Sequence, residues 1–271
     1  MKDIKVVISS PIDTNLYALL VNHLCLKEKG VSVSGIITLK TLSFKRINSE
    51  YKRIGSLLVV KILKKLFANN SDKNFLSKNM DNMISSLGLK QKSLKAFSDD
   101  HATPFIKVND LNNFETITFL KMCKPDLVLS IGSTIIRKSF LEIPSIGVLN
   151  VHMGILPEYR GMGVTEWPLI EERANDIGLG VTLHFMDSGV DTGPIIKKQK
   201  INISDCQSLH DLESKYLIEM VSLMLDGVRM VRDKKLTLEP QKNNEIDMGR
   251  QYYSTHNRMR KLAEKRLIMF K

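Results

Sequence analysis

Two polar side chains interrupt an apolar stretch in the middle of the sequence. Asn150 and His152 lie in the run Gly147-Val-Leu-Asn-Val-His-Met, whose other residues are typical of a buried β-strand. Residues two apart in a strand point to the same side, so the amide and the imidazole should stand together at the carboxyl end of the strand. An amide is a fixed hydrogen-bond donor and an imidazole ionises near neutrality, so this pair suits oxyanion stabilisation and proton transfer.

A second polar segment follows another apolar run. Residues 186–194 read Met-Asp-Ser-Gly-Val-Asp-Thr-Gly-Pro, in which Asp187 and Asp191 alternate with glycines. A single histidine in a strand is more often a core residue than a catalytic one. A second polar strand end downstream favours a site, because open α/β sheets bind ligands beyond the ends of their strands.

These segments carry a family pattern. Asn-x-His at 150–152, Leu-Pro-x-x-Arg-Gly at 156–161 and Asp-x-Gly-x-Asp-x-Gly at 187–193 together resemble the folate-dependent formyltransferases. That family includes glycinamide ribonucleotide formyltransferase, methionyl-tRNA formyltransferase and the N-formyltransferases of nucleotide-linked amino sugars. The resemblance is strong over residues 125–203, weaker before them and thin after 232. It implies that Asn150, His152 and Asp191 are catalytic and that 10-formyltetrahydrofolate is the co-substrate. No His, Asp or Glu cluster has metal-ligand spacing, so no metal is expected.

The resemblance also implies two sets of binding residues. One set would contact the pterin ring of the folate, largely through the backbone, and comprises Ser133, Ile135, Ile136, Met186, Asp187, Gly189 and Val190. The other set stands at the entrance of the acceptor pocket and comprises Tyr159, Arg160 and Gly161. Arg160 either binds a phosphate of the acceptor or orders its own loop. His184, in the following apolar run, matches no motif, and we interpret it as structural.

Patterning predicts the elements that position these residues. Strands are expected at 4–10, 31–39, 104–108, 126–132, 147–152, 179–186 and 195–203, and helices at 112–123, at 164–172 and from a capping box at Ser208–Asp211 through Val228. An early helix with Leu16, Leu19 and Leu20 would be capped by Asp13 or Thr14. We therefore expect an α/β, Rossmann-like formyltransferase fold, a mostly parallel twisted sheet flanked by helices, with a short C-terminal appendage.

The domain boundaries are also predicted. Residues 1–232 would form the catalytic domain, with a basic helical insertion at about 41–99, and 233–271 would form a short basic extension. Gly161-Met162-Gly163 is interpreted as a flexible stretch beside the acceptor pocket. The residues after Leu236 show no clear core periodicity. They are either a solvated basic tail or, through Gly249-Arg-Gln-Tyr-Tyr-Ser254, similar to a feature near the end of some sugar formyltransferases.

Composition limits the alternatives. Three scattered cysteines without metal spacing and a start without a signal-peptide core predict a cytoplasmic protein. No apolar run approaches the ~20 residues that span a bilayer, so membrane insertion is not expected. The net charge of +11 suggests an anionic partner. The sequence leaves the oligomeric state open, and a homodimer is compatible with it.

The acceptor is the least determined part. The length and the short basic tail favour the amino group of a nucleotide-linked amino sugar, as used in surface-polysaccharide biosynthesis. Methionyl-tRNA would explain the charge, but the residues after 236 are too few for the β-barrel that its formyltransferases carry there. Glycinamide ribonucleotide is a further acceptor, and a formyltetrahydrofolate hydrolase would use the same three residues with water in place of the amine.

Overall fold

The computed structural model describes residues 3–40, 87–132, 135–241 and 249–270. Most of the predicted basic insertion, within 41–86, and Ser133 lie outside these residues. The part of the predicted insertion that is described, 87–99, packs into the main core through Leu89, Leu94 and Phe97. Among the described helices, none is long and apolar enough to cross a membrane.

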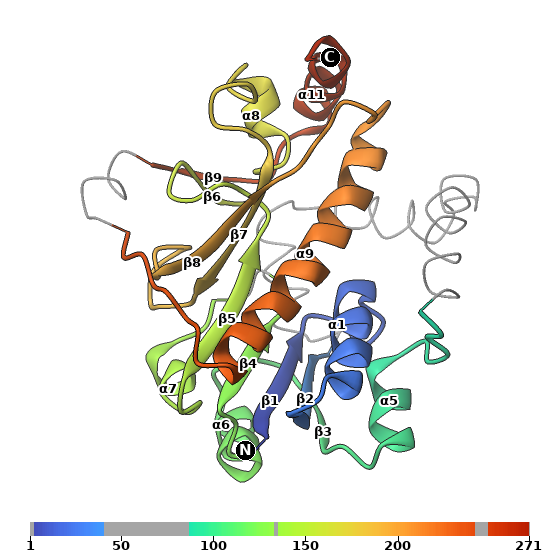
Figure 1. The fold of residues 1–271 in the computed structure, drawn as a ribbon, viewed down its shortest axis with the longest axis vertical. Helices are drawn as coiled ribbons and strands as arrows, with labels where there is room; N and C mark the ends of the chain where they lie inside the picture. Colours follow the sequence, from blue (N-terminus) through green and yellow to red (C-terminus); the bar gives the residue numbers. More distant parts are fainter. Residues whose placement is uncertain (1–2, 41–86, 133–134, 242–248, 271) are drawn as a thin grey trace, which may run out of the picture.

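A seven-stranded sheet forms the centre of the molecule (Figure 1), with the strand order β3-β2-β1-β4-β5-β7-β8. Its strands are β1 Ile4–Ser10, β2 Val31–Leu39, β3 Phe105–Val108, β4 Leu127–Ser130, β5 Gly147–His152, β7 Gly180–Phe185 and β8 Ile195–Lys200. The first five run parallel, whereas β7 is antiparallel to β5 and β8 is antiparallel to β7. This arrangement confirms the predicted mostly parallel α/β sheet.

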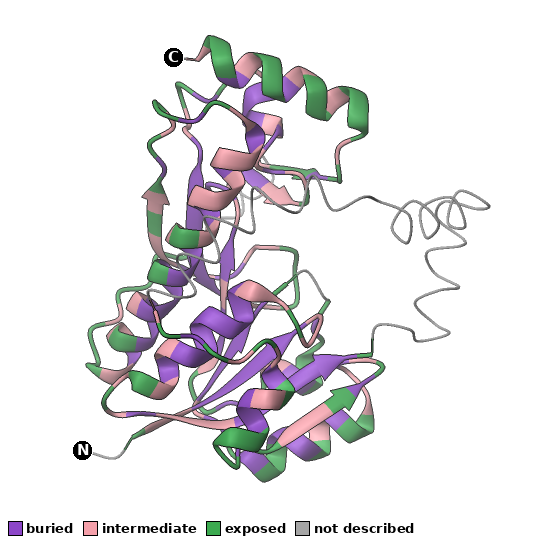
Figure 2. Ribbon diagram, turned by 90° about the vertical axis from the view of Figure 1, so that its right-hand side faces the viewer, coloured by how far each residue is buried: buried purple, intermediate pink, exposed green. Residues whose placement is uncertain are grey.

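Helices cover both faces of the sheet. They are α1 Leu16–Lys27, α5 Leu94–Asp100, α6 Phe114–Cys123, α7 Lys138–Leu141, α8 Trp167–Ile170, α9 Leu209–Arg232 and α11 Asn257–Met269. One apolar cluster contains residues of α1, α5 and α9, and a second contains residues of α6 and α7 on the opposite face. The central strands between these layers are purple in Figure 2 because they are buried on both sides, whereas the edge strands β3 and β8 are partly exposed.

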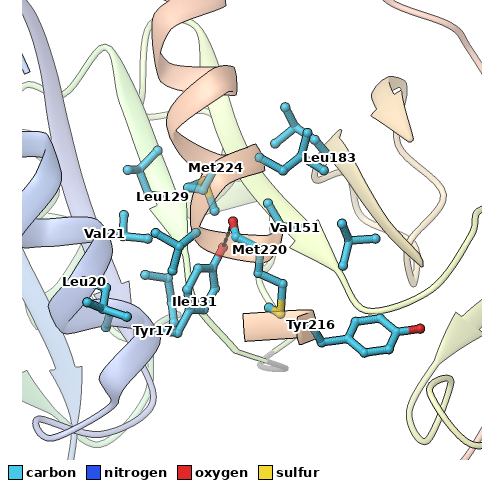
Figure 3. Close-up of a cluster of buried hydrophobic side chains, with 14 of the residues drawn as sticks. Tyr17, Leu20, Val21, Leu129, Ile131, Val151, Leu183, Tyr216, Met220 and Met224 are labelled. Carbon is cyan, nitrogen blue, oxygen red and sulfur yellow. Dashed lines mark hydrogen bonds between the residues drawn. The ribbon is translucent and has the colours of Figure 1, made fainter. Parts of the chain in front are cut away.

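Helix α9 is the main partner of the sheet. Ser208 and Asp211 form the predicted capping box at its start. Met220 and Met224 point from α9 into the space between α1 and the strands, and the Tyr17 hydroxyl of α1 donates to the Met220 carbonyl at 3.4 Å (Figure 3). The neighbours from the strands include Leu129 of β4, Val151 of β5 and Leu183 of β7. Because side chains alternate along a strand, this packing leaves Asn150 and His152 on the other face.

Two predicted helix starts differ from the observed ones. Helix α1 is capped by Asn15, whose side chain accepts the Ala18 N–H, while Asp13 instead accepts the Lys95 N–H at the start of α5. Helix α8 is a single turn, much shorter than the predicted 164–172. Val164 and Thr165 precede it in a turn that begins at Gly163, whose φ of +71° is not helical.

The described part of the C-terminal region is ordered and packed, so its interpretation as a solvated tail is wrong. A short strand, β9 Arg250–Tyr252, pairs in parallel with β6 Tyr159–Gly161 to form a second sheet. Helix α11 then lies along α8 and near the start of α9, where Arg260 pairs with Glu213, and its Ala263 and Leu267 have no exposed surface. Only two of its thirteen residues are buried, so the helical periodicity of apolar residues is weak in this part of the sequence.

Candidate active site

The register of β5 and β7 places three polar side chains together. In this antiparallel pair Asn150 lies opposite His184, and His152 lies opposite Thr182. Directly opposed residues share a face of the sheet, so Asn150, His152 and His184 stand on the side away from α9. Asn150 remains partly exposed, whereas His152 and His184 are buried. The Asn150 side-chain N–H lies 3.1 Å from Nε2 of His184.

The environment of His184 fixes its protonation state. Burial, opposed in part by the nearby carboxylate of Asp191, lowers the pKa of His184 to about 4, so the ring is neutral at pH 7. Its Nδ1 lies 2.9 Å from the carbonyl of Phe185 and must therefore carry the proton. Nε2 is then an acceptor, and the group of Asn150 facing it must be the NH2 and not the oxygen.

His152 lies between two oxygen acceptors. Its Nε2 donates to the backbone carbonyl of Tyr159 at 2.7 Å, and its Nδ1 faces a carboxylate oxygen of Asp191 at 3.4 Å. A neutral ring can offer a proton on only one nitrogen, whereas an imidazolium offers one on each. The arrangement therefore suits a cationic His152 paired with an ionised Asp191.

Asp191 reaches the site by a backward turn. Because β7 is antiparallel, it ends beside Leu149, and not at the carboxyl end of β5 where His152 lies. The loop 186–194 folds back over the sheet and turns at Asp191, whose φ is +54°. The carboxylate accepts the backbone N–H of Gly161 at 2.9 Å and approaches Nε2 of His184 to 3.7 Å. Asn150, His152 and Asp191 thus lie close together. The carboxyl ends of β5 and β7 are at opposite ends of this antiparallel pair, so it is the loop after β7 that brings Asp191 to the other two.

The residues predicted to bind folate have different positions. The Asp187 carboxylate accepts hydrogen bonds from the Gly189 N–H and the Thr192 hydroxyl, so it shapes the loop. Ile135 and Val190 are 75% and 38% exposed. Ile136 is buried in the cluster between the sheet and α6, and Met186 packs against that same cluster. Within the described ranges, no group of three or more His, Cys, Asp or Glu residues is placed to hold a metal ion.

The residues predicted at the acceptor entrance serve the structure of the loop. The Tyr159 side chain has no exposed surface, stacks on Tyr252 and donates to Glu171, so it joins the loop to the C-terminal region. The Arg160 guanidinium donates to the Gly249 carbonyl at 2.6 Å, which favours the loop-ordering role. Gly161 pairs with Tyr252, so the glycines at 161–163 are held in place by β9 and do not form a free hinge.

The contact of His184 with Asn150 is one that the sequence did not predict, although the burial of His184 agrees with its interpretation as a structural residue. Its spacing carries no motif, and only the pairing of β7 with β5 brings it to Asn150. Glu171 was also missed. Its carboxylate accepts the hydroxyls of both Tyr159 and Tyr252, which links the loop after β5 to the C-terminal region. No local pattern marks either contact, because each joins segments that are distant in the sequence.

Comparisons with known proteins place the chain in a family. The family model described as formyl transferase matches residues 27–228. Methionyl-tRNA formyltransferase of Geobacter sulfurreducens is 33% identical over 150 residues, covering 52% of this chain and 46% of that protein. The same enzyme of Trichlorobacter lovleyi is 31% identical over 189 residues, covering 65% and 59%. The chain thus spans about half the length of the curated relatives it matches.

Solved structures share the fold. Phosphoribosylglycinamide formyltransferase from Bacillus halodurans superposes with a TM-score of 0.55 at 17% identity, covering 85% of this chain and 96% of that one. An N-formyltransferase from Helicobacter canadensis, solved with folinic acid and dTDP-3-aminofucose, gives 0.53 at 21% identity, covering 92% and 70%. At such identities the likeness concerns the fold alone. Since the family model covers most of the sequence, including Asn150, His152 and Asp191, the chain belongs to the formyl transferase family.

Proposed function

We propose that this protein transfers a formyl group from 10-formyltetrahydrofolate to a primary amine. The observation that carries the proposal is the placement of His152 between the Asp191 carboxylate and the Tyr159 carbonyl, beside the amide of Asn150. A cation, an anion and a neutral donor on the partly open side of a sheet are the groups that an acyl transfer between nitrogens needs. Membership of the formyl transferase family supports the same reaction.

The reaction forms one C–N bond and breaks another. The amine nitrogen attacks the formyl carbon, the carbonyl oxygen becomes an oxyanion, and the bond from this carbon to the folate nitrogen then breaks. One N–H of Asn150 is used by His184. The second N–H of the same amide is free of that bond and serves as the donor to the oxyanion. A donor fixed before the reaction pays no reorganisation cost as the charge develops.

The histidine and the carboxylate share the remaining tasks. His152 holds its positive charge next to the oxyanion, and Asp191 maintains that charge as its ion-pair partner. The attacking nitrogen loses a proton and the departing folate nitrogen gains one. The Asp191 side chain is 15% exposed, so it has access to solvent and can relay this proton through water.

The folate contacts are part of the proposal. Ile135 and Val190 present exposed apolar surface on the two segments that carry Ile136 and Met186, and these segments meet in one apolar cluster. Exposed apolar side chains of this kind suit the flat face of a pterin ring. The backbone of Met186, Asp187, Gly189 and Val190, together with that of Ser133, Ile135 and Ile136, would supply its hydrogen bonds.

The relatives change the order of the acceptors. Both curated relatives described above are methionyl-tRNA formyltransferases, so we place methionyl-tRNA first, ahead of the amino sugar that the sequence favoured. The net charge of +11 suits a nucleic acid. The amino sugar of a nucleotide remains the second candidate, because the Gly249–Ser254 pattern contains β9, which pairs with β6 at Tyr159–Gly161.

One assay separates these acceptors. The full chain is incubated with 10-formyltetrahydrofolate and, in parallel, with methionyl-tRNA, with nucleotide-linked amino sugars, with glycinamide ribonucleotide, or with no amine. Tetrahydrofolate release and mass spectrometry of the acceptor are followed together. Formylation of an amine by the wild type but not by His152→Ala supports the proposal. Formate release without any amine would identify a hydrolase, and no turnover in any arm would refute formyl transfer.

A further inference from the structure

Two contacts from the region after α9 converge on Asp191. The side-chain amide of Gln241 donates from Nε2 to the backbone carbonyl of Asp191 at 3.0 Å and to that of Gly193 at 2.7 Å. From the other side, Gly161 donates its N–H to the Asp191 carboxylate at 2.9 Å, and Gly161 is paired with Tyr252 of β9. The backbone and the carboxylate of one residue are therefore both held by way of the C-terminal region.

The backbone of Asp191 needs such support. Its φ of +54° is in the left-handed region, which residues other than glycine occupy at a cost unless their surroundings hold them there. The hydrogen bonds within the loop, from Gly189 and Thr192 to Asp187, involve the preceding turn and not the Asp191 carbonyl. The two bonds from Gln241 span the turn from Asp191 to Gly193 and hold it closed.

The contact to the carboxylate depends on β9 in a similar way. Gly161 has a φ of +94°, and a Cβ atom added to it would lie 2.3 Å from the Tyr252 carbonyl oxygen. Strand β9 therefore approaches β6 so closely that only glycine fits at this position. Met162 follows, and its N–H donates to the same Tyr252 carbonyl at 3.0 Å. The direction of the Gly161 N–H, which points to Asp191, is thus fixed by its pairing with β9.

We propose that Gln241 and β9 are positioning elements of the catalytic site. They act through Asp191 by keeping its carboxylate directed at Nδ1 of His152, and they do not touch the reacting atoms themselves. This inference rests on the proposed function, because the Asp191–His152 pair is catalytic only if the protein transfers a formyl group as proposed. It adds to the catalytic unit a residue that lies beyond the 27–228 segment matched by the family model.

The test compares two glutamines. Gln241→Ala removes the two bonds to the loop, whereas Gln199→Ala, on β8, removes a side chain whose amide makes a single exposed contact with Lys200. Small misplacements of a catalytic group can cost up to ~10²-fold in rate. We expect Gln241→Ala to lower kcat by about 10-fold to 10²-fold with the KM for the folate nearly unchanged, and Gln199→Ala to match the wild type. Equal rates for the two variants would overturn the inference.

A conservative variant distinguishes positioning from packing. Gln241→Glu keeps the shape, but as a carboxylate it faces two carbonyl oxygens and repels them, whereas its protonated form donates to one of them. The ratio of its kcat to that of the wild type should therefore rise as the pH is lowered. A ratio that stays flat with pH would show that the contact does not position Asp191.

A readout without turnover separates this inference from the proposed function. The His152 imidazole, which Asp191 and the ring of His184 face, can be observed by NMR at one fixed pH in the wild type and in both glutamine variants. Loss of the two Gln241 hydrogen bonds displaces the carboxylate from Nδ1, so the ring resonances of His152 should move in Gln241→Ala and stay at their wild-type positions in Gln199→Ala. Unchanged His152 resonances in Gln241→Ala contradict the positioning role, even in an active enzyme. An inactive wild type that shows this shift would contradict the proposed function alone.

Discussion

The amide of Asn150 donates to Nε2 of His184 at 3.1 Å, and the opposite nitrogen of His184 donates to the Phe185 carbonyl. Since each nitrogen of this buried ring has one fixed role, the ring determines which way the Asn150 amide faces. An imidazolium at the same place would present a proton to the NH2 group and force it to turn. The neutral state of His184 thus keeps the second Asn150 N–H, the donor of the proposed mechanism, directed away from the ring.

The first prediction concerns this orientation. His184→Ala leaves the Asn150 amide free to rotate, so kcat should fall by roughly 10-fold to 10²-fold while the folate KM stays within about twofold. His184→Gln can restore an acceptor opposite Asn150 and should recover part of the rate. Steady-state kinetics on the three proteins decides the matter. Wild-type kcat in the alanine variant would return His184 to a purely structural role.

The second prediction concerns the ion pair. His152→Ala and Asp191→Asn should each lower kcat by ~10²–10⁴-fold, the usual contribution of a group that transfers or stabilises a proton. The double variant should be little worse than either single one, because the two residues act as a unit. Thermal melting of each protein serves as the control. Near-normal turnover in a folded Asp191→Asn variant would refute its assignment.

The third prediction distinguishes an effect of Asn150 on the transition state from an effect on folate binding. Asn150→Ala should reduce kcat far more than the affinity for folate, since the free N–H acts on the charge that develops during attack. Binding of a stable folate analogue, measured by calorimetry, should stay within a few-fold of the wild type. An effect confined to KM would place Asn150 in binding and not in catalysis.

The fourth prediction concerns the C-terminal helix. Leu267 is fully buried, so Leu267→Ala should destabilise the protein by about 2–5 kcal/mol, the usual cost of truncating a buried leucine. Met269 on the same helix is 81% exposed and provides the control, because Met269→Ala should change the unfolding free energy little. Denaturant unfolding measures both. Equal stability of the two variants would mean that α11 does not stabilise the fold.

The fifth prediction is a pH dependence of stability. Burial lowers the pKa of His184 to about 4 in the folded protein, against 6.5 as the ordinary value of a histidine. Between these values the unfolded chain binds a proton that the native chain does not, so stability must fall as the pH drops from about 6.5 to about 4. The slope from this residue is at most about 1.4 kcal/mol per pH unit. Unfolding curves of the wild type and His184→Gln should diverge in this range, and parallel curves would contradict the assignment.

The sequence allowed the sheet to be predicted because its signals are local, whereas the catalytic trio was implied by the resemblance to a family and stays a prediction. The apolar runs of β1, β2 and β5 and the capping box at Ser208 each depend on neighbouring residues. The missed features join distant segments. The role of His184 depends on the β5–β7 register, and the ordering of the C-terminal region depends on the β6–β9 pair and on the Glu171 contacts. Neither contact has a periodicity that a single segment could reveal.

The pairing of β6 with β9 also has a consequence for when the chain can become active during its synthesis. The residues that pair in it are about ninety positions apart, for example Gly161 with Tyr252. While the chain is still being synthesised, Asn150, His152 and Asp191 leave the ribosome well before Tyr252 does. A nascent chain that stops short of this residue would hold all three groups and yet lack the strand that orients one of them, so competence should arise only late in translation.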